Sequence, residues 1–396
     1  MFSGAARTMV SASSLALLLG APGAVPASAQ TSGSAKKAIM VESGQLQNAD
    51  PFAIFAPSEE RIDHTIDYEI WDFALKQLVV DMGPSIRERP VITTASQIAR
   101  GSRIRAGHNS RYRTEGSMMA FSLLDTAAIE SFTEYRRDLE RVATDALDIS
   151  RLRRDEQLAF WFNLHNAALV EQIAKNWPFR QPRRLEVDGV PLDEAKLITI
   201  RGVSMSLRDI REKIVYANWR DPRVIYGFWR GEIGGPALQR DAFTGQNVDP
   251  LLTEEAENYV NSLRGTEKRG DTLHVSTLYE DAQAFYFPDF AADVRAHIED
   301  YANDEVLDFV GRTSKVEPSL REWDIADLSG GYRDNIALEK SRPGLSAGAV
   351  ELLQQRAIKQ QRIERRKKKG ENTGTVTFTP LVLPEGDPAA TTSEID

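Results

Sequence analysis

The stretch LAFWFNLHNAALVEQIAKN, residues 158–176, decides the fold of this 396-residue chain. Its apolar residues recur at helical spacing, as they do on the buried face of an amphipathic helix. This stripe consists of Leu158, Trp161, Phe162, Ala168, Leu169 and Ile173. No charge interrupts the aromatic part of the stripe. We therefore predict a helix over residues 155–176 that forms the centre of the core.

Three polar residues lie within this apolar helix. Asn163 and Asn166 are three positions apart and therefore side by side, and His165 falls inside the stripe. A buried amide left without a partner costs about 1–3 kcal/mol, so both asparagines must find hydrogen bonds. Either they bond neighbouring backbone and hold the helix in place, or they line a pocket. His165 is either a packed ring with one satisfied nitrogen or a catalytic group.

Working outward from this helix, helical patterns dominate both sides of a short β-rich segment. Helices are predicted near residues 67–82, 127–148, 254–263 and 290–309, and from Ser206 onward with Asp209 completing a capping box. Residues 185–206 read as short strands with hairpin turns at Asp188-Gly189 and Arg201-Gly202, and residues 224–229 as a further strand. These patterns predict an α+β fold, a helix-rich single domain around a small central β-sheet, over residues 67–331.

The segments outside this domain have a different composition. Residues 1–29 contain the three parts of a signal peptide, namely Arg7, an apolar stretch and a cleavage site after Ala29. Residues 30–66 read as a linker and N-terminal arm, 332–369 as a basic C-terminal helix, and 370–396 as a disordered tail. We therefore expect an exported, periplasmic protein of the bacterial cell envelope.

Composition restricts the chemistry and the partners. The chain contains no cysteine, which excludes disulfides and thiol catalysis. Its net charge is -9 although residues 356–369 are strongly basic, so the rest is acidic and nucleic acid is not an expected partner. The basic helix either contacts an anionic membrane surface weakly, contacts the acidic body of this or another chain, or is simply solvated.

One motif resembles a known family. Phe160-Trp161-Phe162-Asn163-Leu164-His165-Asn166-Ala167 resembles the Phe-Trp-Ile-Asn-Leu-Tyr-Asn-Ala signature of the DUF547 proteins. Weaker resemblances follow at 206–210, 221–224, 231–237 and 285–290. The family is uncharacterised, so the resemblance implies a fold and no activity.

Two departures from the family pattern bear on catalysis. The resemblance implies a His in the helix after Ser206 and a Cys at the end of the central strand, a pair suited to thiol catalysis. This chain has Glu212 and Arg230 at those places, so we assign no catalytic residue. The five histidines show no zinc-site spacing, and no cofactor fingerprint occurs, so neither a metal nor a cofactor is expected. Gly344 to Gly348 match a nucleophile elbow but lack the preceding strand and a later His, and read as the start of the C-terminal helix.

The Gly-rich loop from Arg230 to Pro236 is the predicted binding site. Its glycines let a ligand approach the backbone and leave N–H groups free, and Arg230 can hold a carboxylate or phosphate through two hydrogen bonds. The competing interpretation is a tight turn with Arg230 paired to a carboxylate. The predicted ligand-binding residues are Asn163, Asn166, Arg223, Arg230 and Glu232, with His165, Glu212 and Asp289 as secondary candidates.

The predicted function is non-catalytic binding of a small anionic ligand or an envelope protein. The alternative is an envelope hydrolase or transferase that uses carboxylates or His165 in place of a thiol. These classes differ in whether the polar residues converge on one open cleft.

The leader makes a first prediction. The mature protein should begin at Gln30 and occur in the periplasm, because the small residues Ala27 and Ala29 form the cleavage site. N-terminal sequencing of protein from the envelope fraction measures this directly. A cytoplasmic product that retains Met1 would contradict it.

Overall fold

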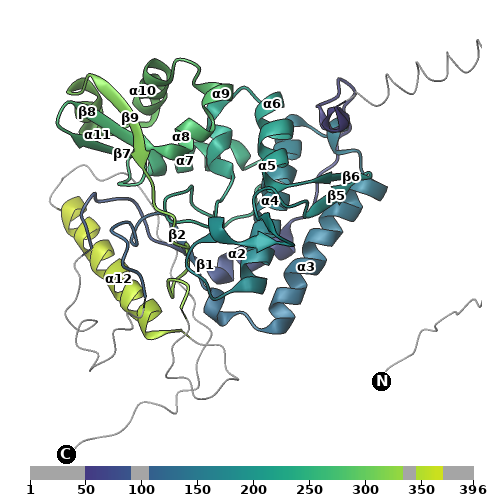
Figure 1. Ribbon diagram of the computed structural model, residues 1–396, viewed down its shortest axis with the longest axis horizontal. Helices are drawn as coiled ribbons and strands as arrows, with labels where there is room; N and C mark the ends of the chain where they lie inside the picture. Colours follow the sequence, from purple (N-terminus) through teal and green to yellow (C-terminus); the bar gives the residue numbers. More distant parts are fainter. Residues whose placement is uncertain (1–49, 91–106, 333–344, 369–396) are drawn as a thin grey trace, which may run out of the picture. The chain divides into compact units, whose positions relative to one another are not determined.

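The computed structural model describes residues 50–90, 107–332 and 345–368 (Figure 1). A compact unit begins at Pro51. The predicted leader at 1–29 and the predicted tail at 370–396 lie outside the described residues. The described part is rich in helices with short strands, as expected for an α+β fold.

Helix α4, Arg154–Asn176, is the core helix that the sequence predicts. The acidic residues Asp155 and Glu156 occupy its first turn, where the positive end of the helix dipole stabilises their negative charges. Pro178 follows its last residue by two positions and cannot continue the helix. Almost the whole middle of α4 is buried, on every side, and it packs against α3 (Thr126–Arg141) and α7 (Val248–Val260). The helix is therefore central and more deeply enclosed than one apolar stripe indicates.

The segment before α4 closes one side of this core. A short 3-10 helix, η1 (Pro51–Phe55), buries Phe52 and Phe55, and the Phe55 ring meets Trp161 edge-on at 5.4 Å. It is followed by α2 (Glu69–Leu78), η3 (Phe121–Leu123), and α3 with its π-helical extension η4 (Val142–Ala146). η5 (Ile149–Arg151) then leads into α4. The last part of the predicted N-terminal arm therefore belongs to the core.

The strands form several small sheets. β1 (Val79–Asp81) pairs with β2 (Ser117–Met119), β3 (Glu186–Val187) with β4 (Val190–Pro191), and β5 (Ile198–Ile200) with β6 (Val203–Met205), all antiparallel. β8 (Thr272–Ser276) lies between antiparallel β7 (Thr266–Arg269) and parallel β9 (Lys315–Leu320). Both predicted hairpin turns are present, with left-handed backbone at all four turn residues: Asp188, Gly189, Arg201 and Gly202.

The predicted capping box at Ser206 is confirmed. Ser206 Oγ accepts from the Asp209 backbone N–H at 3.1 Å, and the Asp209 carboxylate accepts from the Ser206 N–H at 2.8 Å. The box opens a helical run made of α5 (Leu207–Asp209), the π-helix η7 (Ile210–Val215) and α6 (Tyr216–Asn218). π-Helical turns are rare in proteins overall, but those that occur are often found at functional sites. The side chains of η7 are therefore candidates for a site.

Two predicted elements differ in the structure. The strand predicted at 224–229 is wrong: the 3-10 helix η8 (Pro222–Gly227) occupies most of it, because Asp221 caps Arg223 and Pro222 suits a helix start. The single helix predicted at 290–309 is two helices, α10 (Phe290–Tyr301) and α11 (Asp304–Gly311), because Asn303 accepts from the Val306 N–H and starts a new helix. The remaining short elements are η6 (Pro182–Arg184), α8 (Thr277–Asp281) and α9 (Gln283–Tyr286).

The basic C-terminal helix α12, Ala347–Lys368, lies against the same unit (Figure 1). Lys359 is buried and donates to the carbonyl oxygens of Gly83 and Thr114, at 3.2 and 2.6 Å. Arg362 and Arg366 both contact the carboxylate of Glu88. At the start of α12, Ser346 accepts from the Ala349 N–H, so this serine caps the helix as the sequence indicates. Basic side chains of α12 thus contact the body of the same chain.

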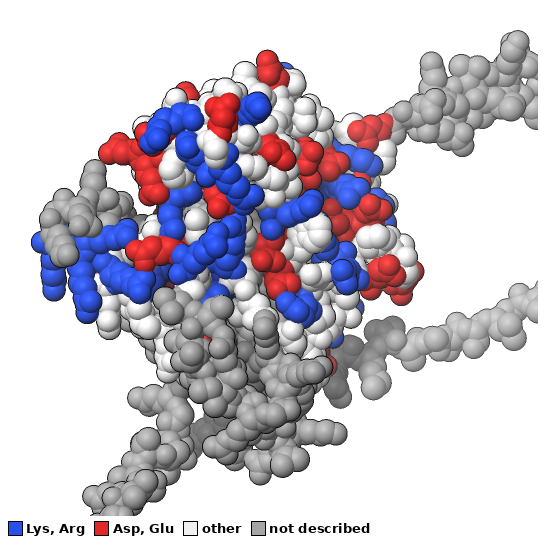
Figure 2. Space-filling view, turned by 60° about the vertical axis from the view of Figure 1, so that its left-hand side comes forward, with Lys and Arg blue, Asp and Glu red and all other residues white. Residues whose placement is uncertain are grey.

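Lys and Arg side chains are interspersed with Asp and Glu side chains on the face of the molecule that Figure 2 shows. Among the described residues, no helix combines the length and the apolar character that crossing a bilayer requires.

The burial of α4 makes a second prediction. Trp161→Ala should lower the free energy of unfolding by about 3–5 kcal/mol, because the indole is fully buried between Phe55 and Phe160. Urea melts of the purified protein measure the loss. Phe73→Ala is the matched control, since this ring is 66% exposed and its removal should cost under about 0.5 kcal/mol. Equal effects of the two variants would show that α4 is not the core.

Candidate functional site

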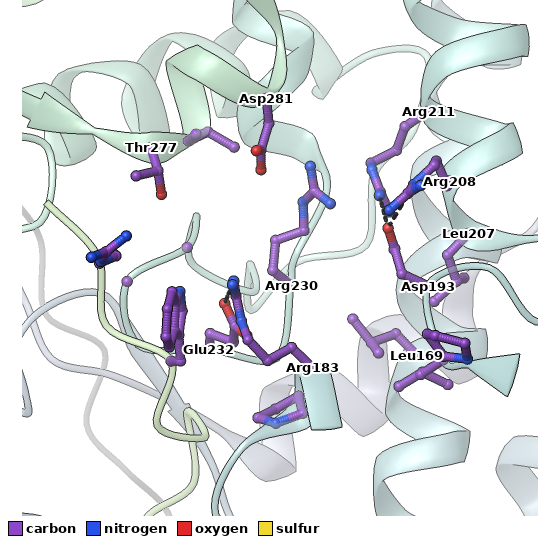
Figure 3. Close-up of a pocket in the computed structure, with 18 of the residues that line it drawn as sticks. Leu169, Arg183, Asp193, Leu207, Arg208, Arg211, Arg230, Glu232, Thr277 and Asp281 are labelled. Atoms are coloured by element: carbon purple, nitrogen blue, oxygen red, sulfur yellow. Dashed lines mark hydrogen bonds and ion pairs between the residues drawn. The ribbon is translucent and has the colours of Figure 1, made fainter. Parts of the chain in front are cut away.

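A cavity of about 310 Å³ opens beside the Gly-rich loop (Figure 3). The loop, the segment around Asp193, the helical run after Ser206, α8 and residues 321–323 surround it. Charged side chains make up much of its lining. They are Arg183, Asp193, Glu194, Arg208, Arg211, Arg230, Glu232, Asp281, Arg321 and Glu322. We call it the Arg230 cavity.

Arg230 projects into the middle of this cavity (Figure 3). Its Nε is buried without a hydrogen-bond partner, and no ion pair joins its guanidinium to any residue that the structure describes. Burial opposes the charge, but nearby acidic groups, including Tyr216, Asp193 and Asp281, outweigh burial and raise the pKa of Arg230. The guanidinium of Arg230 is therefore a cation that nearby groups of the cavity stabilise without a direct ion pair among the described residues.

Arg183 and Arg211, two other arginines of the lining, are paired with carboxylates. Arg183 donates to both carboxylate oxygens of Glu232, at 2.7 and 2.8 Å, which is the planar two-bond geometry that guanidinium and carboxylate favour. Arg211 donates to Asp193 at 2.5 Å. Burial alone would raise the pKa of Asp193, but Arg211 outweighs burial and holds this pKa well below its usual range. Glu232 and Asp193 are thus committed to partners within the protein.

His165 lies behind Arg211 and outside the cavity lining. Its ring is fully buried, with Nε2 3.0 Å from an Arg211 nitrogen and Nδ1 3.0 Å from the Asn166 side-chain oxygen. Because a guanidinium nitrogen can only donate, Nε2 accepts and Nδ1–H donates. Burial, followed by the charge of Arg211, holds the pKa of His165 well below its usual value. The ring is neutral and both nitrogens are used, so its place is structural.

The two asparagines of α4 bond backbone, the first of the two interpretations of the sequence. Asn163 donates to the Phe243 carbonyl at 2.7 Å and accepts from the Phe243 N–H at 3.1 Å. Asn166 donates to the Gly227 carbonyl at 3.0 Å and accepts from the Trp229 N–H at 3.1 Å. Neither side chain lines the Arg230 cavity. They attach α4 to two loops and do not meet a ligand there.

Three further candidates also lie outside the cavity lining. Arg223 pairs with Asp221 and Asp249, Glu212 is partly exposed on η7 beside Arg208, and Asp289 caps α10 by accepting from the Ala292 N–H. Of the residues that the sequence selects, the structure therefore brings Arg230 and Glu232 together in one cavity.

The expectation of free N–H groups in the Gly-rich loop is wrong. The N–H groups of Ile233 and Gly234 donate to the carbonyls of Asp324 and Glu322, at 2.9 and 3.0 Å. Gly234 is required because a Cβ at that position would lie 2.6 Å from the Glu322 backbone nitrogen. The glycines thus allow the loop to pack closely on residues 322–326, and the side chain of Arg230 is the part of the loop that projects into the cavity (Figure 3).

Several cavity residues escape the sequence reasoning. Arg321 and Arg183 both lie over the ring of Trp323, with centroid distances of 5.2 and 4.3 Å. Asp193 and Asp281 belong to segments without a recognised motif. For Arg211 the sequence does contain a usable signal. It is the neighbour of Glu212, which occupies the place where the family pattern implies a His. The inward-facing residue proves to be Arg211.

Among the described residues, no group of three or more His, Asp or Glu side chains is arranged to hold a metal ion.

The neutral state of His165 makes a third prediction. In the unfolded chain this His titrates near its ordinary pKa of about 6.5, whereas the folded protein resists protonation. Its contribution to stability is therefore present above about pH 6.5 and is lost as pH falls below that value. His165→Phe should flatten the fall in unfolding free energy between pH 6.5 and 5, by about 1 kcal/mol per pH unit at most. Urea melts across this range measure the slope, and an unchanged slope would mean that His165 titrates normally.

Part of the chain matches a known protein family. A family model described as "Protein of unknown function, DUF547" matches residues 149–260. The match spans α4, the hairpins, the capping-box helix, η8, the Gly-rich loop and α7. No curated protein and no solved structure matches the chain. Residues 149–260, which include Arg230 and most of the cavity wall, are thus a DUF547 domain, a member of a family of unknown function.

Proposed function

We propose that this protein is an exported binding domain whose Arg230 cavity holds a small carboxylate- or phosphate-bearing ligand without covalent chemistry. The observation that carries the proposal is the guanidinium of Arg230, which lies in the middle of a cavity of about 310 Å³ and has no ion-pair partner in the part of the chain that the structure describes. The leader-like pattern of residues 1–29 supports the proposal of export to the periplasm.

The physical argument rests on the cost of a charge that is partly withdrawn from water and has no ion-pair partner among the described residues. Taking a charge out of water without a partner costs several kcal/mol, so proteins rarely keep one where it has no use. Glu232 lies in the same loop as Arg230 but does not pair with it, because Arg183 occupies both oxygens of that carboxylate. A ligand carboxylate or phosphate would supply the missing acceptor, with two hydrogen bonds to the planar guanidinium.

Arg230 is one of four charged residues in the lining that have no ion-pair partner among the described residues. The others are Arg321, Asp281 and Glu322, and Glu322 accepts a hydrogen bond from the hydroxyl of Ser110 at 2.7 Å. Charges of both signs therefore line the cavity, and the central position of Arg230 is what favours a negatively charged group there.

The position of His165 favours binding over catalysis. A hydrolase or transferase in this cavity would have to rely on Glu232, Asp193 or Asp281, since His165 lies behind Arg211. Turnover of an ester or amide that is lost in Glu232→Gln would contradict the non-catalytic proposal. Retention of that turnover in Glu232→Gln would leave Asp193 and Asp281 as the carboxylates to test in the same way, and its loss in either variant would equally contradict the proposal.

A fourth prediction tests the role of Arg230. Arg230→Met keeps the apolar stem and removes the charge, so binding of 4-methylpentanoate, succinate and inorganic phosphate should weaken at least about tenfold for those that bind. Isothermal titration calorimetry measures the affinities. Arg312→Met is the control, because Arg312 is an exposed arginine on the surface beyond α11 and should leave binding unchanged.

Unfolding measurements separate this role from a structural one. Without ligand, Arg230→Met should keep or raise the free energy of unfolding, because it removes an unpaired charge. Arg211→Met should lose at least about 2 kcal/mol, because it removes the shorter of the two arginine contacts of Asp193 and the donor to His165 Nε2. A comparable loss in both variants, or wild-type protein that binds none of the three probes, would overturn the proposal.

A further inference from the structure

We propose that the ligand of the Arg230 cavity is a zwitterion of the amino-acid type, with its carboxylate on Arg230, its ammonium group on Asp281 and an apolar side chain against the aliphatic wall. This inference rests on the proposed function, because it assumes the carboxylate on Arg230. It adds a second recognition group and a class of ligand.

Asp281 is placed to receive a cation. It is the last residue of α8, it is exposed, and its carboxylate points into the cavity towards the guanidinium of Arg230 (Figure 3). Among the described residues, Asp281 forms no ion pair with a Lys, Arg or His side chain. Asp281 is also among the acids that raise the pKa of Arg230 against burial, so the two opposite charges are near but not in contact.

This separation suits a molecule that carries both charges. A carboxylate and an ammonium group on neighbouring carbon atoms would place a negative charge against Arg230 and a positive charge against Asp281. The hydroxyl of Thr277, one helical turn before Asp281 on α8, adds a neutral hydrogen-bonding group to the same side of the cavity (Figure 3).

Asp281 also discriminates against ligands that carry only negative charge. A carboxylate bound on Arg230 lies close to the Asp281 carboxylate, and this like-charge contact weakens binding. A ligand ammonium converts the repulsion into an attraction. Asp281 therefore provides specificity in two ways, because it attracts the ammonium group of a zwitterion and repels a ligand that carries only negative charge.

The remaining wall of the cavity is apolar. Six aliphatic residues from five segments line it: Leu169, Pro182, Pro191, Leu192, Leu207 and Leu278. A leucine or phenylalanine side chain would bury its surface there, whereas a second charged group would not. The combination of two unpaired charges and an aliphatic wall therefore points to an apolar amino acid or the corresponding short peptide.

The experiment compares ligands that differ in one group. Calorimetry on the full mature chain uses L-leucine, 4-methylpentanoate, which lacks the amine, and N-acetyl-L-leucine, in which the amine is a neutral amide. The wild type should bind L-leucine about five- to tenfold more tightly than either analogue, as expected for one partly exposed ion pair. L-Phenylalanine should behave as L-leucine does.

Variants assign the difference to Asp281. Asp281→Asn should bind L-leucine more weakly and 4-methylpentanoate more tightly, so that the preference disappears. Glu280→Gln, at an exposed neighbouring position outside the cavity lining, should leave all three affinities unchanged.

The outcomes separate this inference from the proposed function. If 4-methylpentanoate binds in an Arg230-dependent manner but L-leucine binds no more tightly, the cavity is an anion site and the zwitterion inference is wrong. The inference is equally wrong if Asp281→Asn keeps the preference for L-leucine. If no carboxylate binds to the wild type, the proposed function fails and this inference fails with it.

Discussion

The side-chain amide of Asn166 is the interaction on which the arrangement of the site depends. It holds the carbonyl of Gly227 and the N–H of Trp229, and so fixes the chain on both sides of Phe228 against the central helix. Arg230 follows immediately, and its direction is set by this attachment. Close packing enforces the same geometry, since a Cβ at Gly227 would lie 2.4 Å from the Phe162 ring. The hydrogen-bonded, buried amide of Asn166 thus orients Arg230 towards the cavity, although Asn166 itself does not line that cavity.

Local patterns in the sequence identify the elements that follow local rules. α4 is predicted by its apolar spacing, the two hairpins by their Asp-Gly and Arg-Gly turns, and the helix start at Ser206 by its cap. The segment at 224–229 has strand-like composition but is a 3-10 helix, because the Asp221 cap and Pro222 act together with burial on all sides. A pattern of apolar residues does not distinguish a buried strand from a short buried helix.

The site is predicted less completely because it is assembled from distant segments. Arg230 stands out as a cation in a Gly-rich loop, and Glu232 stands beside it. Asp193 and Asp281 lie in segments with no motif, and only the fold brings them to the same cavity. Asn163 and Asn166 of α4 show the opposite error. The sequence selects them as ligand-binding residues, but their signature reflects the attachment of two loops to the core. In this domain the most recognisable residues support the site, and the residues facing the cavity are less conspicuous.

The contacts of α12 have a consequence for how the chain folds. Arg356 and Lys359 bond the backbone near Asp81 and Gly83, across separations of 275 and 276 residues. Contacts between such distant residues form late, because a long loop must close before they contribute stability. The carbonyl groups of Gly83 and Thr114 gain their buried Lys359 partner only after residue 359 has emerged from the ribosome. Completion of this domain therefore waits for α12, and the segments around Gly83 and Thr114 lack these bonds until that helix docks.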